Sequence, residues 1–219
     1  MKSNIYIVTG HYGSGKTEFS VNFALSLREK WEKVILVDLD IVNPYFRSND
    51  SRALLESHGI TVIAPAYAGT NVDIPVLPPE IMRVFEEKDA CIVIDVGGDD
   101  DGAIALGRYK QYFDKTDYEM YLVVNTRRPF TSNKEEIAVM KQDIEYASRL
   151  SVTGLVSNSN IAEETTEEIV KEGARITEDA SIMLNLPVKY ICAKDGLFDK
   201  VKDIYGDKAF KITRYLNKI

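Results

Sequence analysis

Residues 10–17 read Gly-His-Tyr-Gly-Ser-Gly-Lys-Thr, and this stretch decides the fold. Its spacing is the G-x-x-x-x-G-K-[ST] pattern of a phosphate-binding loop, which needs a strand before it and a helix after it. The apolar run at residues 5–8 predicts the strand, and apolar residues at helical spacing predict a helix over residues 17–30. The sequence therefore predicts a polyphosphate site between a buried strand and a helix N-terminus.

The residue types of this stretch, called the phosphate loop below, suit a triphosphate and its magnesium ion. The glycines let backbone N–H groups approach an anion without a Cβ in the way. Lys16 is expected to reach the β and γ phosphates, and the Thr17 hydroxyl is expected to bind Mg²⁺. The residues of this region expected to contact the nucleotide are Gly10, His11, Gly13, Ser14, Gly15, Lys16, Thr17 and Glu18.

Composition narrows the classes of function. The 219 residues suit one α/β domain over residues 1–219, and a net charge of −7 argues against broad binding of nucleic acid. Cys91 and Cys192 both lie in apolar runs, which favours buried free thiols over a disulfide or a metal pair. The sequence shows neither a membrane-spanning run nor a signal-peptide pattern, so we expect a cytoplasmic protein.

Strand-like and helix-like segments alternate along the chain, which predicts an α/β fold with a doubly wound, mostly parallel sheet and helices on both faces. The nearly continuous Val/Ile/Leu runs are typical of parallel strands covered on both faces. The expected strands are Ile5–Thr9, Val34–Asp38, Thr61–Ala64, Cys91–Val96, Tyr121–Asn125, Val152–Ser157 and Val188–Ala193. The expected later helices are Glu80–Lys88, Gly102–Phe113, Asn133–Leu150 and Thr166–Leu184.

Carboxylates follow two of these strands. Asp38 and Asp40, one residue apart, could face the phosphates together, one holding Mg²⁺ through water and the other orienting the attacking water. A turn with a helix cap is the alternative. Asp95 ends the next apolar strand as a Walker B magnesium ligand would, and Gly98 follows at the D-x-x-G spacing of nucleotide switches.

Together, the phosphate loop, the Asp-x-Asp segment and the Asp95-Val-Gly-Gly98 strand end resemble the MinD/ParA and CobQ/CobB-type P-loop family, which includes the nitrogenase iron protein and dethiobiotin synthetase. The resemblance implies an ATPase that uses Mg²⁺. It implies that Asp40 positions the water, that Asp38 is its switch companion and that Asn158 reads adenine. An Asn that turns the chain after a strand is the alternative for Asn158.

The family's signature lysine, five residues before Lys16, is replaced here by His11, which leaves the sandwich homodimer of that family in question. Other cations must then meet the charge on the γ-phosphate. Candidates for contacts to substrate or across an interface are Arg47, Arg108, Arg127 and Arg128. Alternatively, the two adjacent arginines are solvated loop charges.

The chemistry that the nucleotide drives stays open among three hypotheses. The first is an ATPase switch coupled to a protein partner. The second is a synthetase that activates the carboxylate of a small-molecule acceptor, as in dethiobiotin synthetase or cobyrinic acid a,c-diamide synthase. Arg127, Arg128 and the Pro65–Pro79 segment would then form the acceptor side. The third is a GTPase or ATPase metallochaperone, although the sequence holds no Asn-Lys-x-Asp guanine motif and no Cys/His cluster.

An apolar stripe at helical spacing runs from Phe198 to Ile219, with lysines and arginine off the stripe. It predicts a terminal helix. Docking of this helix on the sheet is favoured over a basic amphipathic membrane helix, because such stripes are usual in surface helices.

Overall fold

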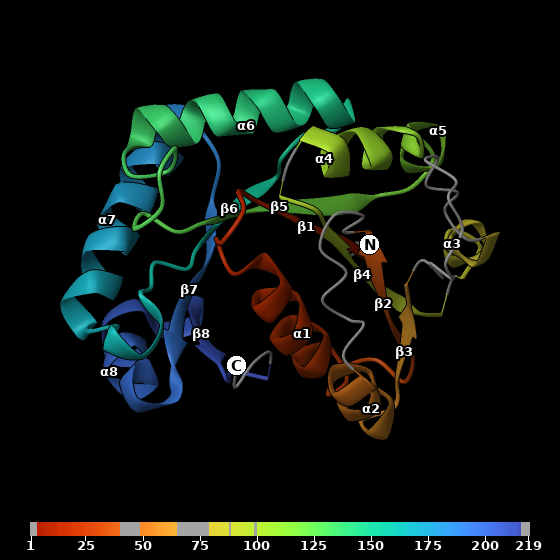
Figure 1. Cartoon of the computed structure of the whole chain (residues 1–219), viewed down its shortest axis with the longest axis horizontal. Coiled ribbons are helices and arrows are strands. Elements are labelled where there is room, and N and C mark those ends of the chain that lie inside the picture. The colour runs from red at the N-terminus through yellow and green to blue at the C-terminus, as the bar shows by residue number, and fades with distance from the viewer. Residues whose placement is uncertain (1–3, 40–48, 65–78, 88, 99, 216–219) are drawn as a thin grey trace.

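The computed structural model describes residues 4–39, 49–64, 79–87, 89–98 and 100–215 (Figure 1). Its centre is an eight-stranded sheet with the order β3-β2-β4-β1-β5-β6-β7-β8, in which every neighbouring pair is parallel. The strands are β1 (Ile5–Thr9), β2 (Val34–Leu39), β3 (Ile60–Ile63), β4 (Cys91–Val96), β5 (Tyr118–Val124), β6 (Gly154–Ser157), β7 (Val188–Lys194) and β8 (Ala209–Ile212).

Helices cover both faces of this sheet, as the alternating pattern predicted. They are α1 (Lys16–Leu27), α2 (Asn49–Ser57), α3 (Pro79–Val84), α4 (Asp100–Gly107), α5 (Lys110–Phe113), α6 (Lys134–Ser148), α7 (Glu167–Leu184) and α8 (Asp195–Tyr205). In Figure 1, α1 and α2 lie on one side of the sheet and α4, α5 and α6 on the other. The doubly wound α/β architecture is therefore confirmed.

Three hydrophobic clusters among the described residues hold these layers together, and the two larger ones lie on opposite faces of the sheet. Phe19 and Phe23 of α1 and Leu55 of α2 pack on one face, together with alternate residues of β1, β2 and β4. Leu106 of α4 and Ile137 of α6 pack on the other face. All six residues of β2 and all six of β4 are buried, which explains their continuous apolar sequence.

The boundaries differ from expectation in the middle of the chain. The predicted helix Gly102–Phe113 is two helices, α4 and α5, with Arg108 and Tyr109 between them. Helix α2 was not predicted, because its sequence Asn-Asp-Ser-Arg-Ala-Leu-Leu-Glu-Ser offers little more than one buried leucine as an apolar anchor. Of the irregular segment Pro65–Pro79, only its last residue, where α3 begins, lies among the described residues.

The prediction of one helix from Phe198 to the C-terminus was wrong. Helix α8 ends at Tyr205, Gly206 follows with a left-handed φ of 56°, and β8 then pairs with β7 as an edge strand. Phe210 and Ile212 alternate with Lys211, so the same apolar positions fit a strand as well as a helix. The continuous helix needed for either the docking or the membrane interpretation is therefore absent from residues 206–215, and residues 216–219 lie outside the described part.

The two cysteines are buried free thiols, as predicted. Burial raises the pKa of the Cys91 thiol to about 12 and also raises the pKa of Cys192 above its usual range. Both side chains therefore stay protonated at neutral pH.

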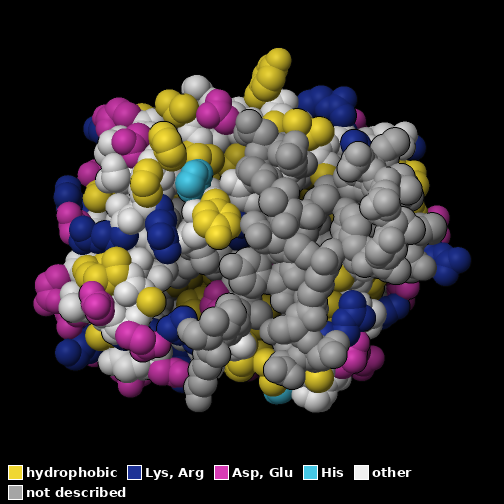
Figure 2. Space-filling view, in the orientation of Figure 1, with side chains coloured by type: hydrophobic (Ala, Val, Ile, Leu, Met, Phe, Trp, Pro, Cys, Tyr) yellow, Lys and Arg dark blue, Asp and Glu magenta, His cyan; other side chains and the backbone are white. Residues whose placement is uncertain are grey.

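Among the described residues, no helix combines the length and the apolar composition that a bilayer crossing requires. On the side of Figure 2 where α7 and α8 lie, acidic and basic side chains are interspersed. That pattern matches the ion pairs along α7, such as Lys171–Glu167 and Arg175–Asp179. This part of the surface thus carries no continuous basic patch.

Candidate functional site: a nucleotide pocket at the carboxyl ends of the strands

The phosphate loop has the backbone shape that an anion needs. Gly13 and Gly15 adopt left-handed φ angles of 74° and 81°, and the Ser14 N–H bonds to the His11 carbonyl at 3.0 Å to close the turn. Helix α1 begins at Lys16 with no side-chain cap on its first N–H groups. Those unsatisfied donors and the positive end of the helix dipole point toward the loop, so the fold presents an anion site there.

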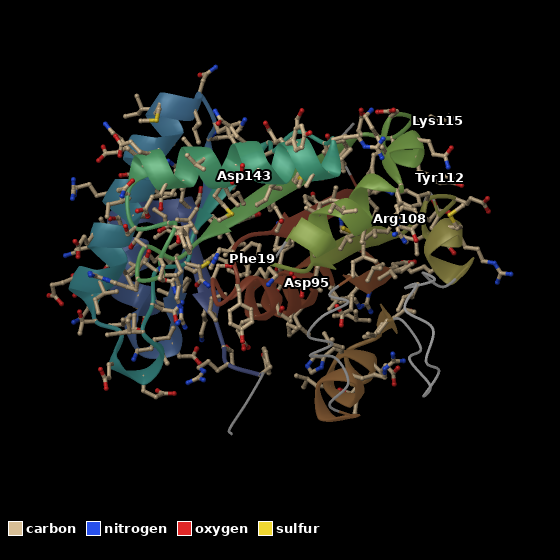
Figure 3. The ribbon with its side chains drawn as sticks, turned by 45° about the horizontal axis from the view of Figure 1, so that its top comes forward. Phe19, Asp95, Arg108, Tyr112, Lys115 and Asp143 are labelled. Carbon is tan, nitrogen blue, oxygen red and sulfur yellow. The ribbon has the colours of Figure 1, made fainter. Side chains whose placement is uncertain are left out.

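Two buried carboxylates lie beside this loop. Asp38 on β2 and Asp95 on β4 are directly opposite each other in the strand register, and both are at most 1% exposed. Asp95 Oδ1 accepts a hydrogen bond from Ser20 Oγ of α1 at 3.0 Å, and Figure 3 places Asp95 against this helix. A neighbouring pair of buried negative charges favours a cation, and carboxylate and hydroxyl oxygens are ligands that Mg²⁺ accepts.

Gly98 lies in direct contact with the phosphate loop. A Cβ at this position would be 2.7 Å from the Tyr12 N, 2.8 Å from Lys16 Nζ and 3.0 Å from the Gly10 carbonyl oxygen. Only glycine fits here without a shift of these atoms, since real Cβ atoms do not come so close to backbone. The segment after β4 therefore lies beside the Lys16 ammonium group. The contact of the Gly98 N–H with a γ-phosphate, which the D-x-x-G spacing indicates, stays a prediction.

A cavity of about 380 Å³ opens beside the loop, which is a size typical of small-molecule sites. Gly13, Gly15, Lys16, Thr17 and Glu18 line one end of it. The other walls come from the loops after β5, β6 and β8 and from the last residues of β7 and β8: Arg128, Asn158, Ser159, Asn160, Ala162, Cys192, Ala193, Lys194, Ile212 and Arg214. The cavity thus runs from the phosphate loop to the far strands at the carboxyl edge of the sheet, where open α/β sheets bind ligands.

Comparison with solved structures shows the same architecture in a group of larger proteins. The cell division protein FtsY of Thermotoga maritima aligns over 86% of this chain and 61% of its own, with 20% identity and a TM-score of 0.60. The signal recognition particle receptor FtsY of Elizabethkingia anophelis in complex with GDP has 19% identity and a TM-score of 0.56, with 87% and 57% coverage. Chloroplast FtsY of Physcomitrella patens has 17% identity and a TM-score of 0.56, with 87% and 58% coverage.

The chain has the P-loop NTPase fold. It spans about three fifths of the length of these FtsY structures, and at such identities the likeness concerns the fold alone. No family model matches the sequence. No curated protein matches it either.

Within this P-loop fold, three asparagines join the loops after β5 and β6 to the phosphate loop. Asn158 Nδ2 donates to the Ser14 carbonyl at 2.8 Å, and Asn160 Nδ2 donates to the Asn158 carbonyl at 2.7 Å. Asn125 closes the network by donating from Nδ2 to the Asn160 carbonyl at 3.1 Å. Asn158, predicted to read adenine, thus lines the cavity and also braces the phosphate loop; base reading stays a prediction.

The outer wall of the cavity is held by α1. Asn22 makes two hydrogen bonds of 2.9 Å with Thr213, one to its carbonyl and one from its N–H, in the manner of a strand partner. The Tyr215 N–H donates to Glu18 Oε1 at 2.6 Å. Residues 213–215 are therefore fixed to the first two turns of α1, beside the phosphate loop.

The other predicted site residues lie as follows. Gly10, His11 and Gly98 line a second recess of about 90 Å³ on the α6 side of the loop, together with Asp143, which Figure 3 shows on that helix. The His11 ring is 5.6 Å from the exposed Phe130 ring. Arg108 follows the end of α4 that is remote from Gly98, and Figure 3 shows it away from Asp95. Asp40 and Arg47 lie outside the described residues.

Sequence reasoning missed most of the far cavity wall. Cys192, Ala193 and Lys194 end β7, and the rule that ligands bind at the carboxyl ends of parallel strands could have indicated them. Arg214 could not be found this way, because β8 itself was taken for a helix. Both Lys194 Nζ and Arg214 Nη1 bond to Glu163, at 2.6 Å to its carbonyl and 2.5 Å to its carboxylate respectively.

Proposed function

We propose that this chain is a magnesium-dependent ATPase that works as a nucleotide switch for a partner protein. The observation that carries the proposal is the convergence of the phosphate loop, Lys16 and two buried carboxylates at one edge of the sheet. Lys16 would neutralise the β and γ phosphates, while Thr17 and Asp95 would hold Mg²⁺ with Asp38 beside them. Asp40, by resemblance, would position the water.

The contact between Gly98 and Lys16 supports the switch. Lys16 Nζ and Gly98 are neighbours, since a Cβ on Gly98 would be 2.8 Å from Nζ. A shift of the ammonium group after loss of the γ-phosphate would therefore change the contacts of the segment after β4. Hydrolysis would therefore change the position of α4, which begins two residues after Gly98. A partner protein that binds near the start of α4 could therefore distinguish the state before hydrolysis from the state after it.

The cavity walls favour adenine over guanine. Guanine presents adjacent N–H donors that a carboxylate accepts together, as Asp does in guanine-specific sites. Among the described lining residues, the one carboxylate is Glu18, which already accepts the Tyr215 N–H. Asn158 and Asn160 line the cavity instead, with their Nδ2 groups bonded to the Ser14 and Asn158 carbonyls, so their amide oxygens would face the base. The GDP in the Elizabethkingia structure belongs to a protein with 19% identity and does not set the base here.

Calorimetry with the full chain tests the nucleotide and the base together. ATP should bind in the presence of Mg²⁺ about tenfold tighter than GTP, which corresponds to about 1.4 kcal/mol. Equal affinities for ATP and GTP would support the triphosphate site but contradict the preference for adenine. Absence of heat with both nucleotides at excess Mg²⁺ would reject the proposed function.

The Asp95→Asn variant tests the magnesium site. It keeps the shape of the side chain and removes its charge, so the Mg²⁺ concentration that gives half-maximal ATP hydrolysis should rise about 10–100-fold. Asp114→Asn is the matched control, since Asp114 is an exposed residue that pairs with Lys110 on α5. An unchanged magnesium requirement in a folded Asp95→Asn protein would exclude Asp95 from the metal site.

The other two hypotheses receive less support. A synthetase needs an acceptor site, and its predicted location, residues 65–78, lies outside the described part of the chain. A metallochaperone needs a cluster of metal ligands, and the described residues contain no group of three or more His, Cys, Asp or Glu placed to hold an ion.

A further inference from the structure

The two adjacent arginines after β5, Arg127 and Arg128, contact different parts of the molecule. Arg127 forms an ion pair with Glu172 of α7, on the outer surface. Arg128 instead lies against the phosphate loop and lines the large cavity. Two neighbours of the same residue type thus have separate environments, and only the second is placed to contact a ligand in that cavity.

The turn that carries Arg128 is held by its own hydrogen bonds. The Arg128 N–H donates to the Asn125 carbonyl at 3.0 Å, and Thr131 Oγ1 donates to the same carbonyl at 2.8 Å. Phe130, between them, has a left-handed φ of 65°, which is uncommon for an aromatic residue. Asn125 belongs to the asparagine network described above, so the turn is fixed relative to the phosphate loop.

The guanidinium group of Arg128 lies against that loop. Arg128 Nε donates to the Gly13 carbonyl at 3.2 Å. A Cβ on Gly13 would be 3.1 Å from Nε, 3.2 Å from Cζ and 3.5 Å from Nη2, so the group covers this glycine. Phosphates bind on the N–H side of such a loop. Arg128 Nε is bonded instead to a carbonyl of the loop.

We propose that Arg128 binds the purine base by stacking its guanidinium plane on the ring, and that it does not bind the phosphates. This inference rests on the proposed nucleotide-binding function. Guanidinium planes stack well on aromatic rings, and a base entering the cavity beside Asn158 would meet this plane at the cavity wall. The tether to Gly13 keeps the plane oriented before the ligand arrives, which lowers the entropy cost of binding.

The experiment compares a ligand that has a base with one that has none. Calorimetry in the presence of Mg²⁺ measures the Kd of ADP and of inorganic tripolyphosphate for the full-length wild type, Arg128→Ala and Arg127→Ala. Stacking predicts that Arg128→Ala weakens ADP about tenfold and tripolyphosphate less than about twofold. Arg127→Ala, which removes the same charge one residue away, should change either Kd by less than about twofold.

Steady-state ATP hydrolysis gives a second readout, in which the loss in Arg128→Ala should appear in KM rather than in kcat. If Arg128→Ala is not folded, Arg128→Met keeps the length of the side chain and takes its place. Equal weakening of ADP and tripolyphosphate would overturn the inference in favour of a phosphate clamp, and unchanged binding of both would overturn it in favour of a surface role. Wild-type protein that binds neither ligand would instead reject the proposed function itself.

Discussion

Replacing Lys16 by alanine should lower magnesium-dependent ATP hydrolysis by about 10²–10³-fold, the cost of removing one preorganised charge from a transition state. Lys16 is 5% exposed, begins α1 and lies within reach of both the phosphate loop and Gly98. In the proposed function, its ammonium group lies where charge builds up on the γ-phosphate. The measurement is single-turnover hydrolysis at saturating ATP, with thermal unfolding as the test of folding.

Lys30→Ala provides the control for this variant. Lys30 is an exposed lysine just beyond α1, so it carries the same charge without contact with the loop. Its hydrolysis rate should equal that of the wild type. Turnover in Lys16→Ala within about threefold of the wild type would contradict the role of Lys16 in neutralising the triphosphate.

Gly98→Ala should lower ATP hydrolysis by about 10²-fold, because a displacement of about 1 Å at a reacting group has effects of that size. The added Cβ would overlap two backbone atoms of the phosphate loop and Lys16 Nζ, and the backbone atoms cannot rotate away. The loop, the ammonium group or the segment after β4 must therefore shift. Hydrogen exchange of the first turn of α4 should rise as well.

Gly196→Ala is the matched glycine control. Gly196 lies in the first turn of α8, and a Cβ built there meets no atom within 4 Å. The same chemical change in a helix should be neutral or slightly stabilising. Full activity in a folded Gly98→Ala protein would mean that the close contact seen in this structure opens when nucleotide binds, and the switch role of Gly98 would be lost with it.

The fold was predictable from the sequence where local pattern and tertiary role agree. The predicted strands Ile5–Thr9 and Cys91–Val96 have the same first and last residues as β1 and β4. Continuous apolar runs flanked by polar turns have few interpretations other than a buried strand. The segment at residues 209–212 was not predictable in this way. Its apolar positions serve a strand period and a helix period equally, and pairing with β7, not propensity, selects the strand.

The residues of the candidate site likewise fall into a predictable group and an unpredictable one. Lys16, Thr17, Asp38 and Asp95 could be found because each lies in a short motif whose chemistry is local. The opposite cavity wall depends on contacts between residues far apart in the chain, such as Asn22 with Thr213, which no motif encodes. The different partners of Arg127 and Arg128 were also not readable, because identical neighbours on a turn differ only in the direction of their side chains.

The attachment of residues 213–215 to α1 has a consequence for biosynthesis. The phosphate loop leaves the ribosome early, but the strand-like pairing of Thr213 with Asn22 spans 191 residues and that of Tyr215 with Glu18 spans 197. In a nascent chain shorter than this, the cavity wall beside the phosphate loop would be incomplete. A nucleotide bound as proposed would therefore stabilise the protein mainly after translation has passed this point.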